Sequence, residues 1–179
     1  MPASNRIVTI FGSSCTEEHD EEYQTALAVG RLLAREGFTV CNGGYKGIME
    51  ASARGAKEAG GRTIGITTSA FEGTANPWID EERRIPSWQE RLFHLIETGE
   101  AYVLLDGGTG TLVEFFTVWE MTNKRLLAKP ILVLGKFLSS LVGELKKQPE
   151  IIFNNFLKIA TSAEEAATYL NTNFCRDGK

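Results

Sequence analysis

Residues 101–120 read AYVLLDGGTGTLVEFFTVWE, and this stretch decides the fold. Residues 101–106 form a short, continuous apolar run, which is typical of a strand buried on both faces of a parallel sheet. A glycine-rich turn follows, and residues 109–127 predict a long helix. A strand, a glycine turn and a helix in direct succession indicate an α/β protein.

The same succession recurs on both sides of this stretch. Apolar runs predict five further strands, at residues 6–11, 38–42, 62–67, 130–135 and 157–160. Helical patterns predict five further helices, at residues 21–36, 46–60, 88–99, 137–147 and 163–172, with Gly37 and Gly61 ending the first two. We therefore expect a Rossmann-like, doubly wound parallel sheet, with residues 1–179 forming a single nucleotide-binding α/β domain.

The alternating pattern fails between Thr68 and Ser87. This segment, TSAFEGTANPWIDEERRIPS, is rich in turn-forming residues and contains two of the five prolines of the chain. It is long for a connection within a compact α/β protein, and loops of such length are often functional. We expect an irregular loop that crosses the binding site, with Arg83 and Arg84 on its exposed face.

The composition excludes several classes of function. A net charge of −4 offers no basic surface for non-specific binding to nucleic acid or to an anionic membrane. The cysteines Cys15, Cys41 and Cys175 are widely spaced, so neither a disulfide framework nor a metal site is expected. No apolar run approaches the length of a membrane span, and no targeting segment is visible. We expect a cytoplasmic protein without nucleic-acid or membrane partners.

Three glycine-rich turns follow predicted strands and indicate an anion site. They comprise Gly12, Ser13 and Ser14 after the first strand, Gly43, Gly44, Gly47 and Met49 after the second, and Gly107, Gly108, Thr109, Gly110 and Thr111 after the fourth. Such turns leave backbone N–H groups bare at helix N-termini, where the helix dipole favours a phosphate. For the first turn, a tight turn whose serine hydroxyls cap the next helix is an equal alternative. None of the turns matches the dinucleotide fingerprint or the Walker A motif.

Glu114 lies in the first turns of a helix that is apolar almost all round. A carboxylate among such neighbours is costly to bury unless it is paired or faces a polar cleft. The spacing of Thr111, Glu114 and Thr117 places them on one helix face below the third glycine turn, which favours a cleft. The alternative is a glutamate that stabilises the start of its own helix. Glu120 and Lys124 are instead spaced as an exposed pair.

Arg91 stands in the helix that leads into the strand at 101–106. We expect the core face of that helix to consist of Trp88, Leu92, Phe93, Leu95 and Ile96. This pattern leaves Arg91 and His94 together on the other side, where Arg91 could reach a phosphate or ribose oxygen. Taken alone, an ordinary surface arginine is the alternative.

Together these residues resemble a known family. The set Gly12-Ser13-Ser14, the G-G-x-x-G-[IL]-M turn at 43–49, Arg91 and the G-G-x-G-T-x-x-E run at 107–114 are similar to the Lonely-guy family of cytokinin riboside 5'-monophosphate phosphoribohydrolases. The resemblance implies a homodimer that cleaves the N-glycosidic bond of AMP-like or cytokinin riboside monophosphates, releasing base and ribose 5-phosphate. It implies catalytic roles for Arg91 and Glu114, and no cofactor.

The chain departs from the family pattern at several positions. Asp106 replaces a proline, Leu92 a lysine, Asn42 and Glu50 glycines, and Thr109 a residue that is commonly aromatic. We expect the lost cation and the added Asp106 carboxylate to weaken phosphate binding or to change the substrate. A non-enzymatic carrier of a nucleotide or of the molybdenum cofactor therefore remains the alternative, since related carriers share the fold and much of the glycine signature.

Overall fold

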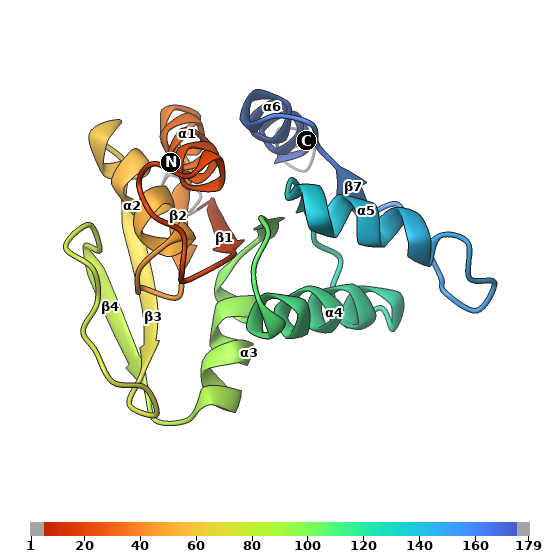
Figure 1. Cartoon of the computed structure of the whole chain (residues 1–179), viewed down its shortest axis with the longest axis horizontal. Helices are drawn as coiled ribbons and strands as arrows, with labels where there is room; N and C mark the ends of the chain where they lie inside the picture. Colours follow the sequence, from red (N-terminus) through yellow and green to blue (C-terminus); the bar gives the residue numbers. More distant parts are fainter. Residues whose placement is uncertain (1–5, 175–179) are drawn as a thin grey trace.

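The computed structural model of the chain describes residues 6–174. They contain a seven-stranded sheet in which every strand is parallel to its neighbours, in the order β4-β3-β2-β1-β5-β6-β7 (Figure 1). Its strands are β1 (Ile7–Phe11), β2 (Thr39–Asn42), β3 (Thr63–Thr68), β4 (Glu81–Ile85), β5 (Ala101–Leu104), β6 (Ile131–Val133) and β7 (Leu157–Ile159). The predicted α/β class and the parallel, Rossmann-like sheet are confirmed.

Each predicted helix is present. The helices are α1 (Glu21–Arg35), α2 (Ile48–Glu58), α3 (Trp88–Thr98), α4 (Thr109–Asn123), α5 (Lys136–Leu145) and α6 (Ala163–Phe174). Gly37 follows α1 with a left-handed φ of 80°, as predicted, but after α2 the left-handed residue is Gly60 instead of Gly61. Within residues 6–174 no helix has the length and apolar character needed to cross a membrane.

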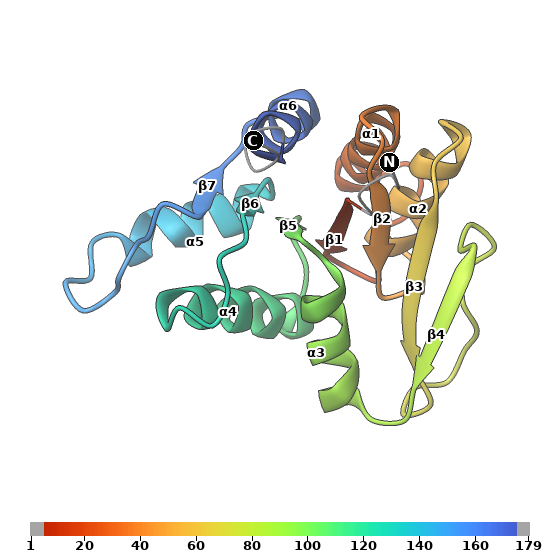
Figure 2. The same cartoon turned by 180° about the vertical axis from the view of Figure 1, so that it is seen from behind.

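The helices cover both faces of the sheet. Figures 1 and 2 show α1, α2 and α6 on one face and α3, α4 and α5 on the other. Successive strand residues point to opposite faces. Ile10 and Val103 therefore belong to the apolar cluster that includes residues of α1, α2 and α6, and Phe11 and Leu104 to the cluster that includes residues of α3, α4 and α5. This double burial explains why the central strands are continuous apolar runs.

Strand β4 corrects the prediction of an irregular loop at 68–87. Its sequence, EERRI, contains one apolar residue and lies at the edge of the sheet, where it pairs only with β3. Arg83 and Arg84 are therefore exposed residues of a strand and do not lie on a loop. Charged side chains protect a sheet edge from pairing with another chain. Because four of its five residues are charged, the strand does not appear in the sequence as an apolar run.

The strand order places a crevice between β1 and β5. From β1 the chain first builds the sheet outwards through β2, β3 and β4, and then builds it in the opposite direction through β5, β6 and β7. Ligands of open α/β sheets bind at such a reversal, outside the carboxyl ends of the strands. The glycine turns that follow β1 and β5 meet at this point.

Candidate functional site

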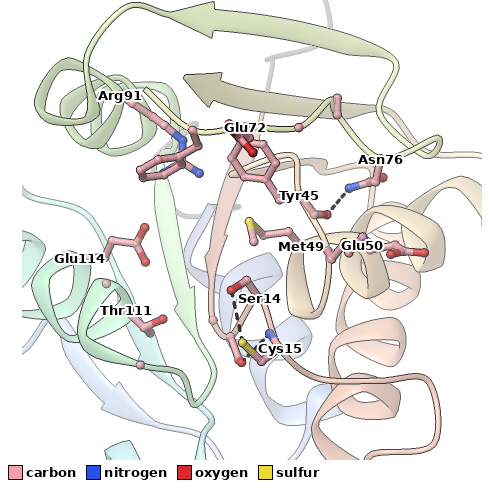
Figure 3. A pocket seen from close by; sticks show the side chains of 18 of the residues that line it. Ser14, Cys15, Tyr45, Met49, Glu50, Glu72, Asn76, Arg91, Thr111 and Glu114 are labelled. Carbon is pink, nitrogen blue, oxygen red and sulfur yellow. Dashed lines mark hydrogen bonds between the residues drawn. The ribbon is translucent and has the colours of Figure 1, made fainter. Parts of the chain in front are cut away.

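A cavity of about 1000 Å³ opens at the carboxyl edge of the sheet (Figure 3). Of the predicted site residues, ten line it: Gly12, Ser13, Ser14, Met49, Arg91, Gly108, Thr109, Gly110, Thr111 and Glu114. The segment 71–77 forms a further side, so the connection after β3 does border the site as expected. In the described range 6–174, no three His, Cys, Asp or Glu side chains cluster as a metal ion would require.

The main chain of Ser13 joins the three glycine turns. Its N–H donates to the carbonyl of Asp106 at 2.9 Å, and its carbonyl accepts from the N–H of Ile48 at 2.8 Å. Its hydroxyl accepts from the N–H of Cys15 at 3.0 Å. Helix α1 begins only at Glu21, so the alternative in which these serines cap the next helix is wrong. The first turn instead ties the third turn to the start of α2.

Four of the predicted glycines, Gly43, Gly44, Gly47 and Gly107, shape the turns without lining the cavity. Gly47 has a φ of 67°, and a Cβ there would lie 2.4 Å from the Ser13 carbonyl. A Cβ on Gly43 would instead collide with Nη2 of the Arg91 side chain. Gly47 therefore requires glycine because backbone atoms leave no room, whereas a side chain at position 43 would displace the Arg91 guanidinium.

The two glycines at the N-terminus of α4, Gly108 and Gly110, differ from these four because packing within residues 6–174 does not exclude a side chain there. A Cβ on Gly108 or Gly110 would meet no protein atom within 4 Å. The backbone N–H groups of Thr109, Gly110 and Thr111 have no hydrogen-bond acceptor in the described part of the chain. Three free donors at the positive end of a helix dipole, without side chains in front of them, suit an anion.

Arg91 is buried beside the cavity. Its Nε donates to the carbonyl of Ile66 at 2.6 Å and its Nη2 to the carbonyl of Gly43 at 3.1 Å. Burial lowers the pKa of Arg91, but a guanidinium remains charged at neutral pH. Among residues 6–174 no carboxylate lies within 4.0 Å of it. A buried cation without an ion pair is costly and favours an anionic ligand.

The burial of Arg91 corrects the predicted core face of α3. The buried residues of this helix are Arg91, Leu92, Leu95 and Ile96, whereas Trp88 and Phe93 are exposed. Backbone carbonyls of β3 and of the second glycine turn satisfy the guanidinium, which is why a charged residue occupies a core-facing position. The alternative of an ordinary surface arginine is wrong.

Glu114 lies across the cavity from Arg91, one helical turn below Gly110 (Figure 3). Burial raises the pKa of Glu114 to about 7, and the positive charge of Arg91 partly opposes this shift. Within residues 6–174 its carboxylate has no hydrogen-bond partner. Close to neutral pH Glu114 can therefore either donate or accept a proton, which is the property of a general acid or base.

Comparison with known proteins assigns the chain to a family. The sequence pattern of the SLOG cluster4 family matches residues 5–163. The chain belongs to the SLOG cluster4 family. The predicted resemblance to the Lonely-guy proteins, which rested on the glycine turns, Arg91 and Glu114, is confirmed.

Named relatives of this SLOG cluster4 chain include two enzymes. A cytokinin riboside 5'-monophosphate phosphoribohydrolase of Rhodococcoides fascians is 29% identical over 132 residues, which is 72% of this chain and 67% of the relative. Its counterpart from Mycobacterium tuberculosis is 31% identical over 119 residues, which is 65% of this chain and 64% of the relative. Among solved structures, the molybdenum cofactor binding protein of Rippkaea orientalis superposes with a TM-score of 0.74 at 25% identity, covering 96% of this chain and 99% of that one.

Asp106 does not lie beside the anion site, contrary to expectation. Its carboxylate accepts from the N–H groups of Phe137 at 2.8 Å and Leu138 at 2.9 Å, so it caps the start of α5. Asn42, another departure from the family pattern, holds the second turn by accepting from Gly44 N–H at 2.8 Å and donating to the Met49 carbonyl at 2.8 Å. Both substitutions in this SLOG cluster4 chain thus serve the scaffold.

Several residues that line the cavity were not among the predicted site residues: Cys15, Tyr45, Lys46, Glu50 and Trp88. For residues 71–77 the sequence predicted only that the connection crosses the site, without naming the residues that line it. Residues 71–77 lie in a loop, which has no periodic pattern of apolar residues. Its cavity-facing side chains could therefore not be predicted from periodicity. The aromatic residues Phe71 and Trp88 were the available signal, since large rings near turn-forming residues often mark a binding surface.

The raised pKa of Glu114 predicts how stability depends on pH. Because the folded protein holds this proton up to about pH 7 and the unfolded chain releases it near the ordinary value of 4.5, wild-type stability falls as pH rises through this window. Glu114→Gln cannot ionise, so we expect its free energy of unfolding to exceed that of wild type by up to about 3 kcal/mol at about pH 8 and to match it at about pH 4. Chemical denaturation across this range measures the difference.

Glu120→Gln is the matched control for this measurement. Glu120 is an exposed carboxylate on the same helix, 3.4 Å from Lys124. Its replacement should change stability only slightly across the window. A Glu114→Gln effect that stays constant with pH would contradict the raised pKa.

Proposed function

We propose that the chain hydrolyses the N-glycosidic bond of a nucleoside 5'-monophosphate, AMP-like or a cytokinin riboside monophosphate, to a free base and ribose 5-phosphate. The observation that carries this proposal is that Arg91 and Glu114 face one cavity, with Glu114 one turn below helix N–H groups that have no acceptor among the described residues. The named phosphoribohydrolase relatives support it.

The phosphate of the substrate would lie at the N-terminus of α4. The N–H groups of Thr109, Gly110 and Thr111 would donate to its oxygens, and the helix dipole would stabilise its charge. The absence of side chains at Gly108 and Gly110 allows the phosphate to approach the backbone closely. The Ser13-Ser14 turn borders the same side of the cavity and would add a second group of donors.

Glu114 would act at the ribose. Cleavage breaks the bond from C1' to the base nitrogen through an oxocarbenium-like sugar, and the oxygen of a water molecule then bonds to C1'. As a carboxylate, Glu114 would stabilise the positive sugar and accept the proton that the water loses. The departing base takes up a proton from solvent and Glu114 returns the proton of the water to solvent, so that in sum the base gains H and C1' gains OH. A pKa of about 7 makes both protonation states of Glu114 accessible during this cycle.

Arg91 would act by charge alone. Its guanidinium cannot give up a proton near neutral pH, so it is no general acid. Its hydrogen bonds to the carbonyls of Ile66 and Gly43 hold the charge in one place. A fixed cation there would stabilise negative charge on the departing base or on the phosphate.

A carrier of a nucleotide or of the molybdenum cofactor is the second candidate. The cavity, at about 1000 Å³, is at the upper end of the range for small-molecule sites and would hold a ligand larger than AMP. The structural similarity to a molybdenum cofactor binding protein supports this reading. Phosphate binding alone does not require the protonation behaviour of Glu114, which is why we favour the enzyme.

We also infer a cytoplasmic homodimer. Val113 and Phe116 on α4 and Phe93 on α3 are large apolar side chains exposed to solvent, on the two helices that carry Glu114 and Arg91. An apolar surface of this kind is typical of an interface between subunits. The free thiols of Cys15 and Cys41 fit a reducing compartment.

The enzymatic proposal predicts adenine release from AMP. Glu114→Gln should lower turnover by about a hundredfold or more while AMP affinity stays within about tenfold, because the carboxylate acts mainly in the transition state. Gly110→Ala should fold normally, since its Cβ meets no protein atom, yet should weaken AMP binding by displacing the phosphate. Chromatography of the products and calorimetric binding measure these two quantities, with Glu120→Gln as the unaffected control. A wild-type protein that binds monophosphates or a pterin cofactor but releases no base would establish the carrier instead.

The dimer proposal predicts a mass of twice 19.7 kDa by light scattering at micromolar concentration. Phe116→Glu should produce monomers, because it places a charge in the apolar contact. Phe137→Glu is the control, since Phe137 is 53% exposed but lies on α5. A wild-type monomer, or dissociation by both variants alike, would refute this interface.

A further inference from the structure

Cys15 is a free, exposed cysteine that lines the cavity. No step of the proposed reaction uses its thiol. The other cysteine within residues 6–174 is Cys41, which lies in β2 and is 0% exposed. A thiol that faces solvent can react with small molecules, whereas a thiol buried in a core is inert. Of these two cysteines, only Cys15 can therefore be reached from the cavity.

The first glycine turn holds Cys15 in place. The N–H of Cys15 donates to the Ser13 hydroxyl at 3.0 Å, and the Cys15 sulfur lies 3.7 Å from the Ser14 hydroxyl. The turn is itself attached to the third glycine turn, because the Ser13 N–H donates to the Asp106 carbonyl at 2.9 Å. Figure 3 shows Cys15 at the Ser14 end of the cavity. The thiol is thus fixed at the end of the cavity that contains the anion site.

Thr111 independently indicates that a ligand binds at this end. Its side chain is 4% exposed, yet its hydroxyl has no hydrogen-bond partner among residues 6–174. On the same helix, Thr117 and Thr122 donate their hydroxyls to the carbonyls four residues back, at 2.6 Å and 2.7 Å. The Thr111 hydroxyl instead projects into the cavity (Figure 3). A buried hydroxyl without a protein partner is completed by a ligand atom.

The Thr111 hydroxyl lies next to the turn that carries Cys15. A side chain at Gly107 would collide with both the Thr111 hydroxyl and the Ser13 N–H, so these two groups are close neighbours. The free N–H groups at the N-terminus of α4 belong to the same helical turn as Thr111. A group attached to the Cys15 sulfur would therefore enter the space that an anion must occupy to reach those N–H groups.

We propose that Cys15 is a reversible modification site at which a low-molecular-weight disulfide closes the anion site. The Cys15 thiolate attacks one sulfur of the disulfide, a new S–S bond forms as the old one breaks, and the other half leaves as a thiolate. Cys15 is oxidised, the leaving half is reduced, and the thiol proton passes to solvent. Excess free thiol reverses the exchange and reopens the site. This inference rests on the anion binding of the proposed function and does not require hydrolysis.

Treatment of native protein with oxidised glutathione tests the assignment. The protein carries Cys175→Ser, because Cys175 lies outside the described residues. Intact-mass analysis and peptide mapping should find a single glutathionyl group, on Cys15, while Cys41 reacts only after denaturation because it is buried. Calorimetry with inorganic phosphate should show binding by the reduced protein and loss of binding after modification. Dithiothreitol should restore the original affinity.

Phosphate should in turn protect Cys15. At a phosphate concentration of about ten times its Kd, the rate of modification should fall about tenfold, because the thiol reacts only while the site is empty. Potassium chloride at the same ionic strength controls for a general effect of salt. Gly110→Ala places its Cβ at the end of α4 without meeting a protein atom. It should be modified at the wild-type rate but require more phosphate for protection.

Cys15→Ser is the matched control, because a hydroxyl cannot form a disulfide. Its phosphate affinity should be the same before and after treatment with oxidised glutathione. The proposal would be overturned by native protein that forms no adduct on Cys15, by an adduct that leaves phosphate affinity unchanged, by absence of protection, or by reduced protein that does not bind phosphate. Failure of the enzymatic function appears separately, as wild-type protein that shows both modification and protection at Cys15 but releases no adenine from AMP.

Discussion

The architecture of the site depends on the main-chain hydrogen bonds of Ser13. The Ser13 N–H joins the turn after β1 to the turn after β5, and the Ser13 carbonyl joins it to the start of α2. Since β1 and β5 are neighbours at the reversal of strand order, these bonds fix where α4 begins relative to the rest of the sheet. Gly47 and Gly107 are required for the same reason, because a side chain at either would collide with this junction. Backbone packing at this junction thus shapes the cavity and leaves the N-terminal N–H groups of α4 free to bind an anion.

Two opposite charges, the buried Arg91 and the half-buried Glu114, face each other on this scaffold without forming a hydrogen-bonded pair. Nε and Nη2 of Arg91 donate to carbonyls, whereas its Nη1 and the Glu114 carboxylate have no hydrogen-bond partner in the described residues and remain available to a ligand between them. A direct ion pair would have held Glu114 ionised with a low pKa. Desolvation instead raises its pKa to about 7, with Arg91 only partly opposing the shift, and this is the condition that the proposed proton transfer at the ribose requires. The rings of Tyr45 and Phe71, whose centroids lie 6.1 Å apart, add apolar surface to the cavity beside Arg91.

The sequence predicted those parts that depend on burial or on backbone conformation. The central strands were apparent as apolar runs because helices cover both of their faces, and several glycine turns were apparent because close packing excludes other residues. Strand β4 was missed because an edge strand carries charges, and Arg91 was misplaced because carbonyls far away in sequence satisfy it. Asp106 was assigned to the anion site from its neighbours along the chain, yet its carboxylate turns towards α5. Such partners depend on tertiary contacts, which local patterns do not encode.

We infer that one cavity orders the phosphate, ribose and base of a nucleotide along the line from the N-terminus of α4, past Glu114, to the rings of Tyr45 and Phe71. A crystal structure of the Glu114→Gln protein with AMP tests it most directly, because the variant should hold the intact nucleotide. The account predicts phosphate oxygens within hydrogen-bond distance of the N–H groups of Thr109, Gly110 and Thr111, with C1' beside residue 114 and adenine against Phe71. A nucleotide bound in the reverse orientation, or a phosphate held away from α4, would contradict the account.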